Sequence, residues 1–239
     1  MSNKTTRPQN TLIFSRGNKK LIYGQVIFNL PAGHSCPFAK NCQSFADRKT
    51  GKIRGGKNTV FRCYAASVEA VYTSARRNNW SNFDLLKGKS KLEMTAILVR
   101  DLPAGILYRI HSSGDFFNQD YFDAWLEVAR VFPNRRFYAY TKAIPFWIKR
   151  LKEIPANFVL NASYGGTHDS LIEKHNLKSV RVVYSEQEAK DLNLEIDHDD
   201  SHAYEGEKNF ALLIHGTQPI GSNACKAWTK IKKEREFWA

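Results

Sequence analysis

Four cysteines are the residues of this chain whose type and spacing point most directly to chemistry. Five residues separate Cys36 from Cys42, Cys63 follows after twenty more, and Cys225 lies near the C-terminus. Thiolates gathered in this way are soft ligands for zinc or for an iron–sulfur cluster. The sequence therefore predicts a metal site on Cys36, Cys42, Cys63 and Cys225.

The spacing of these cysteines favours an iron–sulfur cluster over a zinc ion. Zinc ribbons and knuckles usually present paired Cys-x2-Cys units, which this chain lacks. A [4Fe-4S] cubane is wider than one ion and accepts ligands from distant backbone positions, although the standard ferredoxin spacings are also absent. We therefore expect a [4Fe-4S] cluster and keep zinc as the alternative. His34 is a candidate neighbour or substitute ligand of the site, and a single histidine near cysteines is more often a hydrogen-bond donor than a ligand.

The third cysteine falls at the start of an amphipathic helix. Apolar side chains recur every three or four residues from Thr59 to Arg76 and Arg77. In the first turn, the helix dipole and Arg62 would lower the pKa of the Cys63 thiol and favour metal ligation. The alternative is a small buried thiol on the core face. The basic, glycine-rich segment 47–58 is expected to be mobile unless ligands pin both of its ends.

Strand-like and helix-like stretches alternate along the second half of the chain. Strands are predicted over 105–111, 136–141, 157–163, 179–184 and 210–215. This alternation predicts an α/β fold, a partial (β/α) barrel with mostly parallel strands and the iron–sulfur cluster at one end. We expect a single domain over 1–239, with a polar N-terminal arm (1–20), a cysteine-bearing cluster loop (31–63), β/α repeats (105–215) and a basic C-terminal tail (224–239). The acidic segment 197–208 is expected to be a surface loop.

Polar side chains follow the predicted strands at the ends where active sites of parallel barrels form. Asp115 and Lys142 come from adjacent strands and are the predicted catalytic pair. The alternatives are an N-cap role for Asp115 and simple solvation for Lys142. A cofactor is predicted to bind Ser112, Ser113, Gly114 and Asn161, with the turn at 112–114 offering backbone N–H groups to an anion.

The charge of the chain suggests a second class of function. The formal net charge of +13 attracts polyanions. The basic residues are spread along the chain, and no recognition helix or stacked aromatic platform is evident. Binding of nucleic acid, with a structural zinc or iron–sulfur site, is therefore the alternative function. No apolar run approaches the length of a membrane span, so we expect a cytoplasmic protein without a membrane partner.

Several runs of the sequence resemble a known family. They are LPAGHSCPFAKNCQSFADRKTGK, FRCYAA, RIHSSGDFFNQDYFDAWLEVARVFPNRRFYAYTKA and the late ACKAW. Together they resemble the bacteriophage gene product eighty-eight family from Phe28 to Trp228. The resemblance implies a phage protein in the cytoplasm of the infected host cell, where a host or phage redox partner would meet its cluster.

A more distant resemblance concerns the reaction. The family is similar to radical S-adenosylmethionine proteins, which have a partial β/α barrel with a cubane at its open end. Their Cys-x3-Cys-x2-Cys loop leaves one iron free for the cofactor, and this chain has no such loop. With Cys225 as fourth ligand, no iron would be open, which disfavours S-adenosylmethionine. The expected role is electron transfer, redox sensing or an unconventional radical-type reaction, and the question of enzymatic activity stays open.

Overall fold

The structure is a computed structural model that describes residues 10–17 and 24–237. Of the expected N-terminal arm, only 10–17 falls within these residues. The strands are β1 (Phe14–Arg16), β2 (Val26–Phe28), β3 (Ser44–Ala46), β4 (Ile53–Gly55), β5 (Leu107–Ile110), β6 (Arg136–Thr141), β7 (Phe158–Ser163), β8 (Ser179–Val183), β9 (Glu195–Ile196) and β10 (Phe210–Leu213). The helices are α1 (Tyr64–Val71), α2 (Thr73–Leu86), α3 (Lys91–Asp101), α4 (Gln119–Val131), α5 (Ile144–Ile148), α6 (Ser170–Lys174), α7 (Glu186–Asp191), α8 (Ser201–Tyr204) and α9 (Asn223–Phe237).

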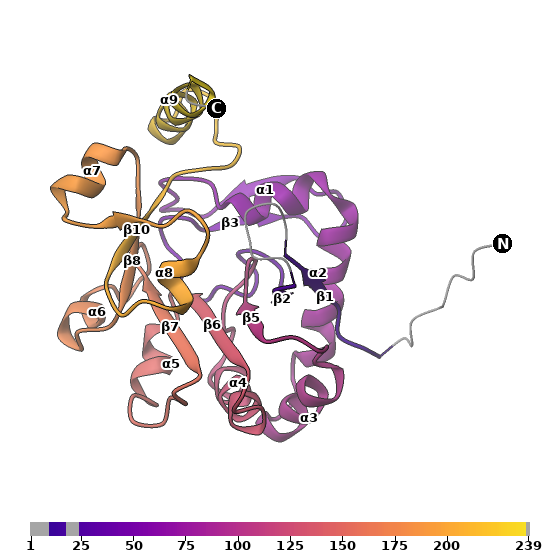
Figure 1. The fold of residues 1–239 in the computed structure, drawn as a ribbon. Coiled ribbons are helices and arrows are strands. Elements are labelled where there is room, and N and C mark those ends of the chain that lie inside the picture. Colours follow the sequence, from indigo (N-terminus) through magenta and orange to yellow (C-terminus); the bar gives the residue numbers. More distant parts are fainter. Residues whose placement is uncertain (1–9, 18–23, 238–239) are drawn as a thin grey trace.

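An eight-stranded sheet forms the centre of the molecule (Figure 1), in the order β1-β2-β5-β6-β7-β8-β10-β9. Only β1 runs antiparallel to its neighbour, and the other pairs are parallel. The expected α/β fold with mostly parallel strands is therefore confirmed. Within the described residues β1 and β9 are the two edges and do not pair, so the sheet is not closed into a barrel.

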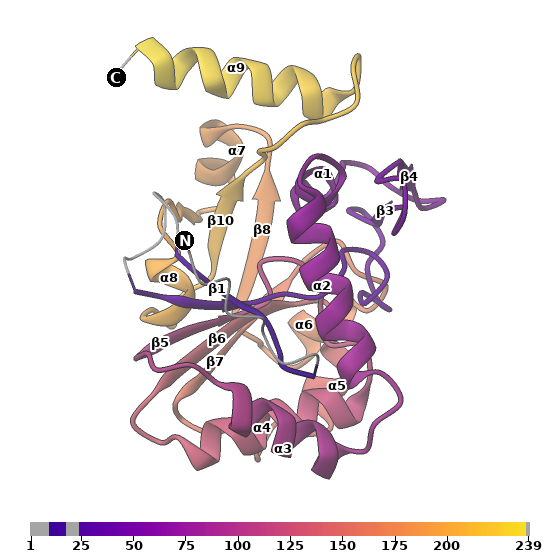
Figure 2. The same cartoon turned by 90° about the vertical axis from the view of Figure 1, so that its right-hand side faces the viewer.

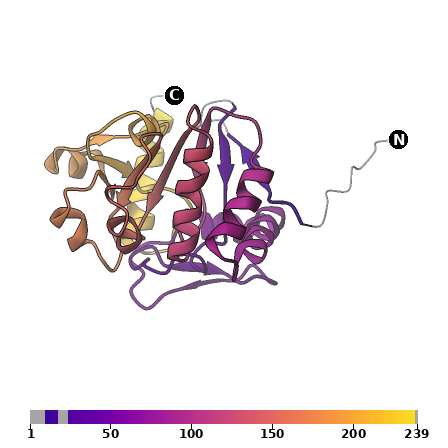
Figure 3. The same cartoon turned by 90° about the horizontal axis from the view of Figure 1, so that it is seen from below.

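One face of the sheet is covered by helices through an aromatic core. Trp125 of α4 is fully buried, and its ring centroid lies 5.5 Å from that of Phe28 and 6.4 Å from that of Phe137. Viewed from below, α3 and α4 lie in front of the strands (Figure 3). The N-cap of α4 is Asn118, whose side chain accepts from the backbone N–H of Tyr121. The alternative role of Asp115 as the helix cap is therefore wrong.

The other face of the sheet is covered by the segment that was expected to be a surface loop. Successive side chains of a strand point to opposite faces, so Tyr138 lies opposite Phe137. Its ring packs against Tyr204 of α8 with centroids 5.6 Å apart, and Asp197 and Asp200 are buried. Figure 1 shows α8 on the side of the sheet away from α4 and α5. The surface-loop prediction for 197–208 is therefore wrong for the buried residues Asp197, Asp200, Ala203 and Tyr204, whereas 205–208 follow α8 at the surface.

The cysteine loop carries its own small sheet. Strands β3 and β4 pair as an antiparallel hairpin beside α1 (Figure 2). The guanidinium of Arg48 forms an ion pair with Asp84 of α2 and lies 4.6 Å from the ring centroid of Trp80. These contacts attach the segment 47–58 to α2. The helix expected from Thr59 begins only at Tyr64, with Cys63 as its N-cap, and is interrupted at Tyr72, between α1 and α2.

Candidate metal centre

Three of the four cysteines line one cavity of about 170 Å³. The cavity lies between the cysteine loop and the carboxyl ends of the parallel strands, where Asp115, Lys142 and Ser163 also reach its wall. Functional groups gather at this edge in parallel α/β proteins. Cys36, Cys42 and Cys63 therefore meet the predicted strand-end residues in one place.

The fourth cysteine lies elsewhere. Cys225 is on α9, where its backbone N–H donates to Ser222 Oγ at 3.1 Å, and it does not line the cavity. Among the described residues, no group of three or more His, Cys, Asp or Glu side chains is placed to hold a single metal ion. The three thiols thus share one cavity, and Cys225 does not join them.

Backbone bonds of Asn41 bring the second and third cysteines together. Its N–H donates to Gly165 O at 2.9 Å, and its carbonyl accepts from the N–H groups of Val60 and Phe61 at 2.7 and 3.1 Å. Residue 41 precedes Cys42, and residues 60 and 61 lie just before Cys63. The loop therefore closes on itself next to Cys42 and Cys63, against the turn that follows β7.

Burial is the main cause of the raised pKa values of the Cys63 and Cys36 thiols. It raises the pKa of Cys63 to about 12, with a further increase from Cys42, although the N–H groups of Ala66 and Ala65 and the charge of Lys142 act against it. The prediction of a lowered pKa at Cys63 is therefore wrong in its net direction and correct for the helix N–H groups. Burial likewise raises the pKa of Cys36, and Asp115, Cys63 and Cys42 add to that increase.

Asp115 and Lys142 are adjacent, but their side chains do not form an ion pair. The Asp115 carboxylate accepts from Thr141 Oγ1 at 2.6 Å, from Lys142 N–H at 2.8 Å and from Phe116 N–H at 2.8 Å. The Lys142 ammonium donates to Ser163 Oγ at 2.6 Å. Both residues are buried, so Lys142 is not simply solvated. Asp115 thus joins the ends of β5 and β6, whereas Lys142 presents its charge at the cavity.

The residues predicted to bind a cofactor fall into two groups. Ser112, Ser113 and Gly114 line the cavity. The N–H groups of Ser112 and Ser113 donate to Asn29 Oδ1 at 2.8 and 3.0 Å. Because these N–H groups already have an acceptor, they are poorly placed to bind an anion. Asn161 does not line the cavity, and its Nδ2 donates to Ala139 O at 3.2 Å and Ala203 O at 3.0 Å. Asn161 therefore fixes α8 to the sheet.

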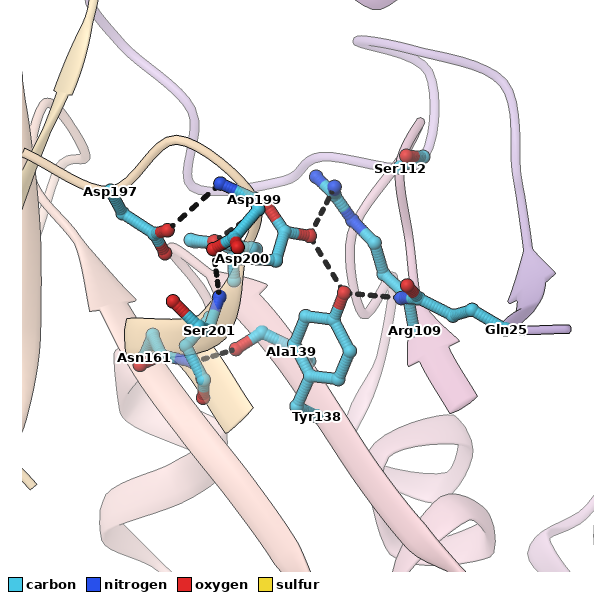
Figure 4. Close-up of polar contacts among 12 residues, drawn as sticks. Gln25, Arg109, Ser112, Tyr138, Ala139, Asn161, Asp197, Asp199, Asp200 and Ser201 are labelled. Atoms are coloured by element: carbon cyan, nitrogen blue, oxygen red, sulfur yellow. Dashed lines mark hydrogen bonds and ion pairs between the residues drawn. The ribbon is translucent and has the colours of Figure 1, made fainter. Parts of the chain in front are cut away.

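A buried polar network beside the cavity escaped the sequence analysis (Figure 4). Arg109 Nη1 lies 2.6 Å from Asp200 Oδ2, which also accepts from Tyr138 Oη at 2.6 Å. Tyr140 Oη donates to the other carboxylate oxygen at 3.2 Å. Arg109 lines the cavity. The sequence feature that could have revealed Arg109 is its charge within the otherwise apolar strand pattern GILYRIH.

Glu69 was also missed, and it secures the cysteine loop. Its Oε1 accepts from Ala32 N–H at 2.9 Å, from Asn79 Nδ2 at 2.8 Å and from Ser113 Oγ at 2.8 Å. The residue is fully buried. His34 lies outside the cavity lining, with its ring against Phe45 and Trp80. An acidic side chain within the apolar run AASVEAV was the signal for Glu69.

Comparisons with known proteins identify the family of the chain. Two curated relatives, both named Gene 88 protein, come from Mycobacterium phages D29 and L5, and each is 39% identical to this chain over 90 residues. The match covers 34% of this chain and 38% of each relative, so the chain spans well under half the length of these relatives. No solved structure matches. The family described as Gene product 88 matches residues 3–234, and the chain therefore belongs to that family.

Proposed function

We propose that Cys36, Cys42 and Cys63 hold one [4Fe-4S] cluster at the carboxyl edge of the sheet. The observation that carries this proposal is the convergence of three half-buried thiols, from three separate positions of the cysteine loop, on one cavity. A cubane accepts ligands from such separated positions, because each thiolate binds a different iron. In this proposal the eight-stranded sheet acts as the wall of a partial (β/α) barrel, which the consecutive order of β5, β6, β7 and β8 supports.

With three cysteine ligands, the fourth iron of the cluster would face the cavity. The lining of that cavity includes the cationic side chains Arg62, Arg109 and Lys142, and its acidic residue Asp115 is occupied by three hydrogen bonds. A small ligand with an anionic group could therefore bind beside the open iron. This arrangement favours ligand chemistry at the cluster over electron transfer alone, and S-adenosylmethionine becomes a ligand to test.

Anaerobic purification followed by iron and sulfide analysis and electron paramagnetic resonance tests the cluster. We expect about four irons and four sulfides per chain. Cys63→Ser should lose most of the iron, whereas Cys225→Ser, which has the same chemistry, should retain it. A finding of stoichiometric zinc without sulfide would overturn the proposal of an iron–sulfur cluster. Equal iron loss in both variants would overturn the three-cysteine site and favour a closed four-cysteine site.

Titration with S-adenosylmethionine tests the open iron. If the fourth iron faces the cavity, the electron paramagnetic resonance spectrum of the reduced cluster should change as the ligand binds. Lys142→Ala should weaken that change without altering the iron content, because the ammonium would no longer face the ligand. A spectrum unchanged by this ligand and by small carboxylates would contradict ligand chemistry and leave the cluster a redox or structural role.

A further inference from the structure

A second cavity lies between the β3–β4 hairpin and α2, and no cysteine lines it. Its volume is about 220 Å³. It is lined by Arg48, Lys49, Thr73, Arg76, Arg77 and Trp80. This lining, which we call the basic groove, contains four cations and no acidic side chain. Such a concentration of one charge attracts an anion.

Two of these four cations interact with acidic groups of the protein, Arg48 with Asp84 and Arg76 with the buried Glu69, which leaves the charge of Lys49 and Arg77. Among the described residues, Arg48 is the only one of the four cations of the groove that forms an ion pair, and its partner is Asp84. Arg76 is buried and donates to the backbone carbonyl oxygens of Arg48 and Glu69. The hairpin extends the positive charge, because residues 48–57 contain five cations and no acid.

The groove is rigid enough to be a preformed surface. Gly51 has a φ of +73°, and a Cβ there would lie 2.9 Å from Ala70 O, so the hairpin packs directly on the end of α1. The carboxylate of Asp47 accepts from Lys49 N–H at 3.1 Å and Thr50 N–H at 2.7 Å, which fixes the turn. Binding would therefore not have to order a mobile loop.

An exposed aromatic residue adjoins the groove in sequence. Tyr72 is 60% exposed and directly precedes Thr73, which lines the groove. An exposed tyrosine beside a row of cations is the combination that binds single strands, because a base stacks on the ring while phosphates contact the cations. A duplex would keep its bases stacked on one another and would leave this ring without a partner.

We propose that the basic groove, with the hairpin and Tyr72, binds single-stranded nucleic acid. Lys49 and Arg77 contact phosphates, and Tyr72 stacks on an unpaired base. The proposal does not depend on the cluster, since no cysteine lines the groove.

Fluorescence anisotropy with labelled DNA and RNA strands of about 12 nucleotides tests this site. We expect binding at low salt that weakens linearly in the logarithm of salt concentration. The double variant Lys49→Ala/Arg77→Ala should bind at least tenfold more weakly and lower the salt slope by about 1.4, or about 0.7 per lost phosphate contact. The control Lys149→Ala/Lys152→Ala removes the same charge from exposed positions at the end of α5 and just beyond it, and should change affinity less than twofold.

The variant Tyr72→Ala separates stacking from charge. It should weaken binding of the single strand roughly tenfold and leave binding of a duplex of the same sequence unchanged. Equal losses in both lysine-containing double variants, or no binding to any strand at low salt, would overturn the proposal. A preference for the duplex that survives Tyr72→Ala would also overturn it. Iron content and melting temperature of each variant, measured alongside, distinguish failure of this site from failure of the cluster or of folding.

Discussion

Individual buried polar residues hold together the segments that enclose the cavity. Glu69 and Asp115 each accept three hydrogen bonds, and most of their partners belong to other segments of the chain. Such a residue costs free energy unless all of its partners are in place, so it selects one arrangement of the loop over others. The cysteines are thus positioned by residues that would not themselves bind the cluster.

Replacement of Glu69 should separate the loop from the sheet. In Glu69→Ala, three buried donors lose their acceptor, and we expect the free energy of unfolding to fall by about 3 kcal/mol or more. Glu69→Gln keeps Oε1 and replaces only Oε2, which has no hydrogen-bond partner among the described residues, so it should cost less than half as much. Urea denaturation and iron content measure both effects. Equal losses in the two variants would contradict the role of Oε1.

His111 should make the fold sensitive to acid. Burial lowers its pKa from 6.5 to about 3, so between these values the unfolded chain binds a proton that the folded chain excludes. The free energy of unfolding should therefore be highest above pH 6.5 and should fall on acidification, by up to about 1.4 kcal/mol per pH unit.

The matched variant for this pH dependence is His111→Asn, because the residue has a φ of +72° and asparagine tolerates that region. Urea denaturation across the acid range should show a shallower decline for the variant. Burial lowers the pKa of His34 too, so part of the slope should remain. Identical slopes in variant and parent protein would argue against His111 as the source.

For individual residues, the sequence predicted which side chains lie near the cavity better than it predicted what each side chain does there. The sequence placed all four cysteines in one site, and the structure brings Cys36, Cys42 and Cys63, which are close along the chain, to one cavity that Cys225 does not line. Arg109 and Asp200 were not paired in advance, since 91 residues separate them and neither has a local pattern that reveals its partner. The net effect of burial on the pKa of Cys63 likewise depends on packing that a sequence does not display.

Among the elements, the cysteine loop shows how backbone geometry limits the site. Gly33 has a φ of +73°, and a Cβ would lie 2.4 Å from Ser44 O at the start of β3. Gly88, between α2 and α3, has a similar φ of +78° but no heavy atom within 4 Å of such a Cβ. Alanine at Gly88 would therefore cost only the strained backbone conformation, whereas alanine at Gly33 would add a steric clash with Ser44 O.

Gly33→Ala should destabilise the protein more than Gly88→Ala. We expect Gly88→Ala to cost about 1 kcal/mol for the left-handed conformation alone. Gly33→Ala should cost that amount plus the displacement of β3, roughly 3 kcal/mol in total, and should reduce iron content. Thermal unfolding with iron analysis provides the measurement. Equal costs would mean that the loop yields freely around Gly33.

The sequence predicted regular elements well where local pattern dominates. The strand expected over 136–141 coincides with β6, because a run of aromatic and apolar residues bounded by turns marks it clearly. The surface-loop prediction failed for the first part of the segment 197–208, because its acidic residues suggested exposure to solvent. In the fold Asp200 is paired with Arg109 and Tyr138, so a polar segment fills the inner face of the sheet.

For the whole molecule, the C-terminal helix stabilises the last strands. Ile231 of α9 is 4% exposed and belongs to a buried cluster with Ala211, Leu213 and Ile214. Figure 2 shows α9 crossing the end of the molecule near α7. Among the described residues, no helix is long and apolar enough to cross a membrane. We therefore assign α9 to packing around β10.

Removal of the buried side chain of α9 should affect stability and leave the cluster intact. Ile231→Ala should lower the free energy of unfolding by roughly 2–4 kcal/mol. The control Ile220→Ala changes a fully exposed isoleucine and should stay within about 0.5 kcal/mol. Denaturation curves and iron content are the readouts. Loss of iron from folded Ile231→Ala protein would point to a direct role of α9 at the cluster.

The position of the three cysteines along the chain has a consequence for synthesis. Cys36, Cys42 and Cys63 all precede β5, whereas Lys142, Ser163 and other residues that line their cavity follow it. Because a ribosome releases the N-terminal part first, the thiols emerge before most of the wall that encloses them. A cluster would therefore have to be delivered after the chain is complete, or be protected on the nascent chain until β10 joins the sheet.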